Sequence, residues 1–219
     1  MNCLAYSPDG QIIATGDDYG KVKLWNTTSG FCFVTFGDHT APITDVVFSP
    51  QGASVFSSSL DGSVRAFDLV RYRNFRTFLP PQSAQYTCVA VDSSGEVVCA
   101  GTMDPYEIHL WSVQTGRLLD VLTGHEGPIS ALTFSPTSTL LASGSWDRTV
   151  RLWDVYAKRV PTEVLHHPSD VLAIAFRPDG KQLAVTSLNG QIHFWEPSTG
   201  YLLSFLELKW WKCLNGICI

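Results

Sequence analysis

The stretch "SGSWDRTVRLWD", residues 143 to 154, holds a serine, an aspartate and a tryptophan at short intervals. A glycine-histidine pair, Gly124-His125, lies a short way upstream. Ser, His and Asp are the parts of a hydrolytic triad, so this set is either a catalytic site or a group of residues that holds the chain together. The rest of the sequence decides between these two readings.

Trp153 belongs to an internal repeat. Similar tripeptides recur along the chain at intervals of 42 to 44 residues, with the aromatic positions Trp25, Phe67, Trp111, Trp153 and Trp195. A second marker keeps the same register: Pro8, Pro50, Pro136 and Pro178, with Asp92-Ser93-Ser94-Gly95 in the third repeat. Two markers in one register indicate a repeat architecture.

Each repeat reads as a series of short strands. In the fourth repeat, "ISALTFSP" (129–136) is an apolar run closed by a proline turn, and "TLLASGSWD" (139–147) and "TVRLWDV" (149–155) follow it. The upstream run "RLLDVLTGH" (117–125) supplies a strand to the preceding unit. Strands of this length with turns every ~8 to 12 residues predict an all-β architecture.

A period of this length with Gly-His and Trp-Asp markers resembles the WD40 repeat, a four-stranded blade of a β-propeller. The resemblance implies an all-β WD40 β-propeller with about five four-stranded blades over residues 1–208, forming an incomplete ring of a larger propeller. The expected blade boundaries are approximately 1–40, 41–82, 83–125, 126–167 and 168–208.

The WD40 resemblance assigns a structural role to the opening set. In such repeats a histidine, a hydroxyl residue, an aspartate and the tryptophan form one hydrogen-bonded group, which here is His125, Ser143, Asp147 and Trp153. A satisfied buried network of this kind makes a blade rigid. A triad nucleophile needs instead an exposed hydroxyl beside an oxyanion hole. We therefore expect a structural brace here and no enzyme activity.

The other repeats hold partial copies of this set. The second keeps His39, Ser57 and Asp61 with Phe67 at the tryptophan position. The first has Thr15 and Trp25, with Tyr19 at the aspartate position and Asp18 one place early; the third has Asp104 and Trp111 with a longer turn and no histidine; the fifth has Trp195 and substitutes Asn189. Five partial copies suit a repeated brace better than one catalytic site.

Longer stretches are more distinctive than the generic repeat. "MNCLAYSPDG" (1–10), "SSLDGSVRAFDLVRYRNFRTF" (58–78) and "WSVQTGRLLDVLTGHEGPIS" (111–130) resemble the periodic tryptophan protein 2 family, WD-repeat subunits of the small-subunit processome. The resemblance implies a non-catalytic nucleolar scaffold for maturation of 18S ribosomal RNA from its precursor. The partners it implies are other WD-repeat processome subunits, the U3 small nucleolar RNA particle and pre-ribosomal RNA, with no membrane, cofactor or small-molecule substrate. The alternative is a generic WD40 adaptor, such as a substrate receptor of a ubiquitin ligase.

The chain carries a small net negative charge, but one segment is rich in arginine. The net charge of -5 argues against binding to nucleic acid by bulk electrostatics. In "RYRNFRTF" (71–78), however, Arg71, Arg73 and Arg76 alternate with Tyr72 and Phe75. Such a segment first suits a solvent-facing outer strand whose charges prevent edge pairing. It also suits a contact with a protein partner or, less directly indicated, with RNA.

Cysteine and histidine patterns indicate no metal site. The six cysteines form no C-x-x-C pair and four lie in apolar runs, which favours free thiols in a reducing compartment. Adjacent side chains of a strand point to opposite faces, so His166-His167 is expected at a loop or blade edge. The N-terminus does not resemble a signal peptide and no apolar run reaches membrane-spanning length, so we expect a soluble intracellular protein.

The C-terminal segment 209–219 reads "KWWKCLNGICI" and departs from the family pattern. We interpret it as a non-family tail of a truncated or alternatively spliced form, and Met1 likewise begins a blade. An arc of five blades would leave an apolar face at each end, so we expect the chain to be marginally stable alone.

Overall fold

The computed structural model describes residues 1–80, 82–156 and 161–207. Their secondary structure is twenty strands, arranged as five antiparallel sheets of four consecutive strands each. The first two sheets contain β1 (Cys3–Tyr6), β2 (Ile12–Gly16), β3 (Val22–Asn26) and β4 (Cys32–Phe36), then β5 (Ile43–Phe48), β6 (Ser54–Ser59), β7 (Val64–Asp68) and β8 (Arg73–Phe78).

The remaining three sheets repeat the same order. The third contains β9 (Tyr86–Val91), β10 (Val97–Thr102), β11 (Ile108–Ser112) and β12 (Leu118–Leu122), and the fourth β13 (Ile129–Phe134), β14 (Leu140–Ser145), β15 (Thr149–Asp154) and β16 (Glu163–His166). The fifth contains β17 (Val171–Phe176), β18 (Leu183–Ser187), β19 (Gln191–Glu196) and β20 (Tyr201–Glu207).

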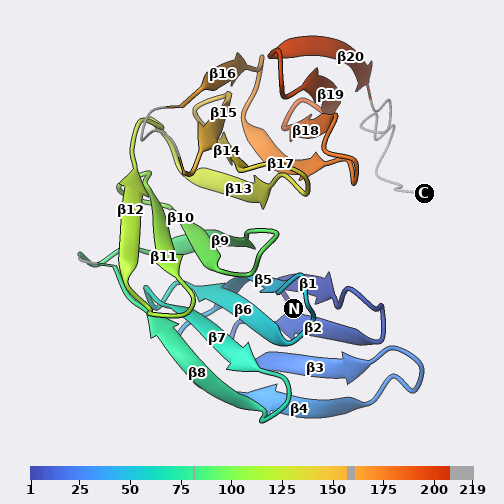
Figure 1. The fold of residues 1–219 in the computed structure, drawn as a ribbon, viewed down its shortest axis with the longest axis vertical. Helices are drawn as coiled ribbons and strands as arrows, with labels where there is room; N and C mark the ends of the chain where they lie inside the picture. The colour runs from blue at the N-terminus through green and yellow to red at the C-terminus, as the bar shows by residue number, and fades with distance from the viewer. Residues whose placement is uncertain (81, 157–160, 208–219) are drawn as a thin grey trace, which may run out of the picture.

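The five sheets are the blades of an open propeller. Figure 1 shows them following one another along an arc, with an opening between the first and the fifth blade. The first strand of each blade packs against the first strand of the next, from β1 through β5, β9 and β13 to β17. The expected all-β WD40 architecture with five blades and an unclosed ring is therefore confirmed.

The hydrophobic core lies between the blades. Four clusters of buried side chains fill the four blade junctions, and each cluster draws from two neighbouring sheets. Between the third and fourth blades, for example, Cys99 and Leu110 pack with Ile129 and Trp153. Because both faces of an inner blade are buried, its middle strands read as nearly continuous apolar runs.

Glycine at one position of the second strand lets the next blade approach closely. A Cβ atom on Gly16, Gly101 or Gly144 would lie 2.4 to 2.7 Å from a side-chain atom of the first strand of the following blade. The atoms in question belong to Ile43, Ile129 and Val171. Hydroxyl side chains then join the blades: Thr87 donates to the Ile129 carbonyl at 2.5 Å, and Ser130 donates to the Val171 carbonyl at 2.7 Å.

In the described part of the chain, no helix is long and apolar enough to cross a membrane. The expected tail, residues 209–219, lies outside the described residues.

Candidate functional site

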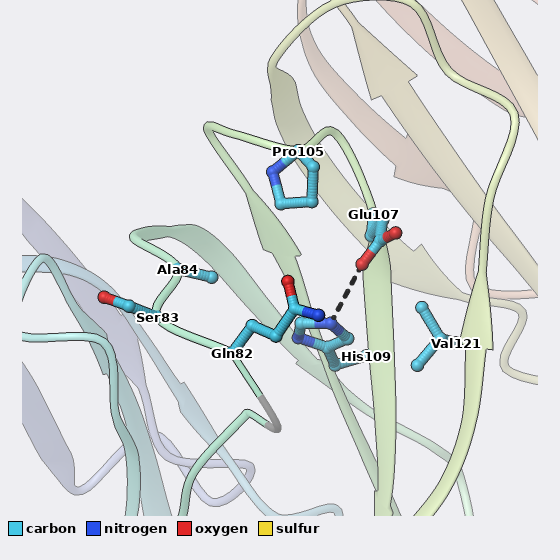
Figure 2. Close-up of a pocket in the computed structure, with 7 residues that line it drawn as sticks. All are labelled: Gln82, Ser83, Ala84, Pro105, Glu107, His109 and Val121. Atoms are coloured by element: carbon cyan, nitrogen blue, oxygen red, sulfur yellow. Dashed lines mark ion pairs between the residues drawn. The ribbon is translucent and has the colours of Figure 1, made fainter.

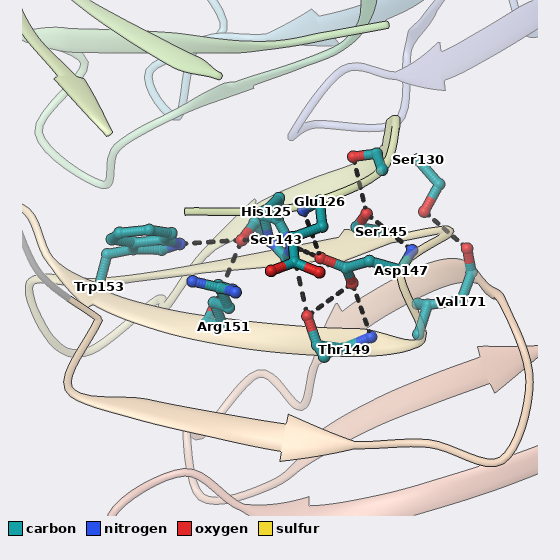
Figure 3. Close-up of polar contacts among 11 residues, drawn as sticks. His125, Glu126, Ser130, Ser143, Ser145, Asp147, Thr149, Arg151, Trp153 and Val171 are labelled. Atoms are coloured by element: carbon teal, nitrogen blue, oxygen red, sulfur yellow. Dashed lines mark hydrogen bonds and ion pairs between the residues drawn. The ribbon is translucent and has the colours of Figure 1, made fainter. Parts of the chain in front are cut away.

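The fourth blade brings the opening set together. His125, in the loop before β13, makes one hydrogen bond through Nδ1 to Asp147 Oδ2 and one through Nε2 to Ser143 Oγ, each at 2.7 Å. The indole N–H of Trp153 donates to the same Ser143 oxygen at 2.8 Å. Figure 3 shows these four side chains, hereafter the brace, converging from β14, β15 and the two adjoining loops.

The protonation of the brace follows from Asp147. Burial alone would raise the pKa of this carboxyl, but hydrogen bonds from His125 and Thr149 outweigh burial and hold the pKa well below its usual range. Because the carboxylate is ionised, His125 Nδ1 must carry a proton and donate it. In the neutral ring Nε2 then accepts from the Ser143 hydroxyl, whose oxygen accepts from Trp153.

This geometry resembles a Ser-His-Asp triad but blocks its chemistry. Ser143 has no exposed surface, and its oxygen is already engaged by the imidazole and by the indole N–H. A nucleophile must instead reach a substrate beside donors for the developing oxyanion. The brace therefore offers no accessible nucleophile at this site.

Sequence reasoning missed part of the brace. The hydroxyl of Thr149 donates to Asp147 at 2.6 Å, and the backbone N–H groups of Glu126 and Thr149 donate to the same carboxylate at 3.0 and 2.8 Å. The spacing of the aspartate and a hydroxyl residue two places later is the signal that would have found this contact, since the second blade repeats it.

In the second blade the brace has no tryptophan. His39 contacts Asp61 at 2.8 Å and Ser57 at 2.7 Å, and the Ser63 hydroxyl donates to Asp61 at 2.6 Å. Phe67 fills the tryptophan position without a hydrogen bond. Its ring is buried and stacks on Phe36 of the first blade, with ring centroids 4.3 Å apart.

The first blade keeps only the indole contact. Trp25 donates to the Thr15 hydroxyl at 2.9 Å. Tyr19 is exposed, and Asp18 accepts from Asn2 at 2.8 Å. The turn is held instead by Asp17, a residue that the repeat alignment did not single out; its carboxylate accepts the backbone N–H groups of residues 19 and 21 at 3.0 and 2.9 Å.

The third blade has a different polar group. Ala100 pairs with His109 across the strands, as Ser143 pairs with Arg151 in the fourth blade, so no hydroxyl faces the tryptophan. The indole N–H of Trp111 consequently has no hydrogen-bond partner among the described residues. His109 packs against Trp111, with ring centroids 5.6 Å apart, and bonds to the Tyr86 hydroxyl at 2.8 Å. Asp104 lies on the exposed turn before Pro105 and is no part of this group.

The fifth blade corrects the expectation for His166-His167. His167 does lie in the loop between β16 and β17, but its ring is buried against Trp195 and His193, at centroid distances of 5.4 and 5.0 Å. His167 therefore takes the place of the brace histidine, and its spacing of 42 residues from His125 was the signal missed. Asn189 bonds to Gln191.

The fifth-blade histidine lacks the partners that the fourth-blade histidine has. Val185 stands at the serine position, opposite His193. Both ring nitrogens of His167 and the indole N–H of Trp195 have no partner in the described part of the chain. Burial, followed by the charges of His193 and His166, lowers the pKa of His167 to about 4.

The candidate contact segment lies on β8, an outer strand, and on the turn before it (Figure 1). Arg71 and Arg73 are exposed, as are Tyr72 and Phe75. The Tyr72 ring meets Phe33 of the first blade edge-on at 6.1 Å. Arg76 differs from the other two arginines, because its guanidinium donates to the Gln114 carbonyl at 2.8 Å and so ties the second blade to the third.

Comparison with known proteins places these blades in a family. The "WD domain, G-beta repeat" (WD40) family pattern matches residues 1–26, 30–68, 116–154 and 159–196. The chain belongs to the WD40 family. The third WD40 blade lies largely between the matched segments, in agreement with the loss of its brace.

Among curated proteins, the chain is similar to periodic tryptophan protein 2 and its homologs. Identity is 59% over 151 residues with the mouse homolog, 56% over 153 residues with that of Dictyostelium discoideum, and 56% over 150 residues with the protein of Saccharomyces cerevisiae. These alignments cover 68 to 69% of the WD40 chain but only 16 to 17% of each relative.

Proposed function

We propose that this WD40 chain is part of a non-catalytic scaffold of the small-subunit processome, which matures 18S ribosomal RNA from its precursor. The observation that carries the proposal is the identity of 56 to 59% with periodic tryptophan protein 2 relatives from mouse, slime mould and yeast. Identity at this level extends beyond the residues that every WD40 repeat needs. The proposed location is the nucleolus.

The arrangement of the polar side chains in the brace supports a scaffold role. The hydroxyl, imidazole and carboxylate groups of the brace are buried and bonded to one another, and they hold loops in place on one edge of a blade. Fixed loops and exposed outer strands are surfaces for partners. The proposed partners are other WD-repeat processome subunits, the U3 small nucleolar RNA particle and pre-ribosomal RNA.

Affinity purification of the tagged chain from nuclear extract tests the partners. We expect co-purified RNA to be enriched at least tenfold in U3 and in the 5′ leader of the ribosomal precursor, relative to 5S RNA and to a tagged WD40 protein of the cytoplasm. Equal recovery of U3 with the chain and with that control protein would contradict the proposal.

For the outer strand β8 we propose a direct partner contact through Arg71, Tyr72, Arg73 and Phe75. Arg71 and Arg73 side chains reach solvent beside two aromatic rings, which suits stacking and cation binding. The double variant Arg71→Glu with Arg73→Glu should reduce recovery of the partners several-fold. The double variant Arg177→Glu with Lys181→Glu, which reverses two exposed charges on the fifth blade, is the matched control and should leave recovery unchanged.

A further inference from the structure

The third blade contains a pocket where the second and fourth blades have a brace. It has a volume of about 230 Å³. Its floor is His109 and Val121, which pair across β11 and β12, and the loop 82–84 and the turn at Pro105 form its rim. Gln82 stands in this loop at the position that His39 and His125 occupy in the loops of the second and fourth blades. Figure 2 shows the Gln82 amide near the His109 ring, with Pro105 above them and Val121 to their right in this view.

The polar wall of the pocket is a fixed carboxylate. Glu107 Oε2 lies 3.4 Å from His109 Nε2, and the Tyr86 hydroxyl bonds to the other ring nitrogen at 2.8 Å. Burial lowers the pKa of His109, although Glu107 opposes the shift, so the ring is neutral at physiological pH. A neutral ring orients Glu107 without cancelling its charge, and the Glu107 side chain keeps 30% of its surface exposed.

The remaining walls are apolar or neutral. Ala84, Pro105 and Val121 supply aliphatic surface, and Gln82 supplies an amide oxygen that can accept a hydrogen bond. No lysine or arginine is among the described residues that line the pocket. An anionic ligand such as a phosphate would therefore meet an uncompensated carboxylate, whereas a cation on an aliphatic stem would find a partner for each of its parts.

We infer that this third-blade pocket is a binding site for a basic side chain, lysine or arginine, presented by a partner protein. The stem packs against Val121 and Pro105, and the charged head bonds to Glu107 and to the Gln82 amide. The inference does not depend on the processome role, since a scaffold of any assembly would use the same contact.

The test is a titration of the full 219-residue chain, followed by the amide NMR signals of residues 82–84, 105–109 and 120–122. The probes are N-acetyl-arginine amide and N-acetyl-lysine amide, with N-acetyl-norleucine amide as the uncharged match for lysine. We expect saturable shifts at these residues for at least one basic probe, with a dissociation constant of roughly 1 to 10 mM, and none for norleucine. Shifts with norleucine equal to those with lysine and arginine would overturn the inference, as would no saturable shift with either basic probe.

Two variants locate the binding. Glu107→Gln should weaken it at least tenfold, while Glu96→Gln, an exposed glutamate at the opposite end of β10, should leave it unchanged. Val121→Trp fills the pocket but keeps its charge, so it should abolish binding even if the Glu107 variant folds poorly. Undiminished binding by both pocket variants would show that the probes bind elsewhere. The probes report binding alone, so this result and the RNA recovery experiment fail independently.

Discussion

At the scale of single residues, the brace converts four polar side chains into one closed group. Asp147 fixes the tautomer of His125, His125 orients the Ser143 hydroxyl, and the serine oxygen accepts the Trp153 indole N–H. Every buried donor in this chain of contacts finds an acceptor. Removing one member leaves the others buried and unpaired, which costs more than the lost bond itself.

The first prediction concerns Ser143. Replacing it by alanine leaves both His125 Nε2 and the Trp153 N–H without a partner, so Ser143→Ala should lower the free energy of unfolding by about 2 to 3 kcal/mol. Ser138→Ala removes an exposed hydroxyl from the same blade and should change it by less than about 0.5 kcal/mol. Urea denaturation of both variants gives the comparison, and equal midpoints would show that the brace contributes nothing.

The second prediction concerns Val185, where a hydroxyl would give the Trp195 indole N–H the hydrogen-bond acceptor that it lacks. In the first blade Trp25 donates to the hydroxyl of Thr15, and Val185 occupies the corresponding position beside Trp195 and His167. Val185→Thr keeps the side-chain shape and adds an acceptor, so it should stabilise the chain by about 1 kcal/mol. Val150→Thr, in the same buried cluster, adds a hydroxyl and should destabilise it. If thermal unfolding shows that both variants lose equal stability, the unpaired Trp195 and His167 groups of the fifth blade do not limit its stability.

The third prediction concerns the pH dependence of stability, to which Asp147 and Asp45 contribute in opposite directions. The low pKa of Asp147 means that its contribution is present above the unfolded value of about 4 and is lost as the pH falls below it. Asp45 behaves oppositely: burial, against hydrogen bonds from the backbone N–H groups of Val89 and Val46, raises its pKa to about 6. Its contribution is complete below about pH 4 and is lost as the pH rises through 6.

Unfolding free energies measured from about pH 3 to pH 8 separate the two groups. Asp45→Asn should flatten the decline between about pH 4 and 7, and Asp147→Asn should remove part of the loss on the acid side. A decline above pH 4 that persists unchanged in Asp45→Asn would assign it to another group.

How far the sequence predicts the residues depends on the kind of contact. The brace partners of the fourth blade follow from types and spacing, because hydrogen bonding demands particular groups at particular positions. His109 was missed because it stands on β11 where other blades have Lys23, Arg65 and Arg151. Its bond to Tyr86 is a contact with no repeat spacing behind it. The pocket beside His109 exists because the third blade lacks the brace histidine and serine, and no sequence motif marks the absence of these residues.

At the scale of elements, alternating strands and turns predict the twenty strands well, since most of the strands are followed by a turn that contains glycine, proline or aspartate. The faces between blades were not predictable in the same way. Whether Gly101 is a loop-type glycine or a point of close approach depends on the following blade, and only the structure shows Ile129 against it.

The fourth prediction tests this close approach. Gly101→Ala places a Cβ atom 2.5 Å from Ile129 Cγ2, so the third and fourth blades must separate, at a cost of about 1 to 3 kcal/mol. Gly37→Ala is the control, since its Cβ meets no atom within 4 Å. Differential scanning calorimetry should show a lower melting temperature for the first variant only, and unchanged melting of both would mean that the junction is loosely packed.

At the scale of the whole molecule, the arc exposes apolar side chains on its end blades. Leu4 and Tyr6 of the first blade are 52% and 61% exposed, and Leu206 of the fifth is 55% exposed. The corresponding faces of the inner blades are covered by a neighbour. Exposed apolar surface of this extent promotes association.

The fifth prediction follows for the isolated chain. It should bind a hydrophobic dye such as anilinonaphthalene sulfonate and should associate with increasing concentration, as analytical ultracentrifugation would show. Replacing Leu4 and Leu206 by lysine should reduce both effects. A monomer that melts sharply and binds no dye would contradict the expectation that the end blades need cover.

We propose above that this WD40 chain acts as a scaffold within pre-ribosomes. A sucrose-gradient profile of the endogenous protein from nuclear extract, with and without RNase, tests it most directly. We expect the protein to sediment with very large particles that collapse to light fractions on RNase treatment. A light peak that RNase does not change would contradict the proposal and favour an adaptor that works outside ribosome assembly.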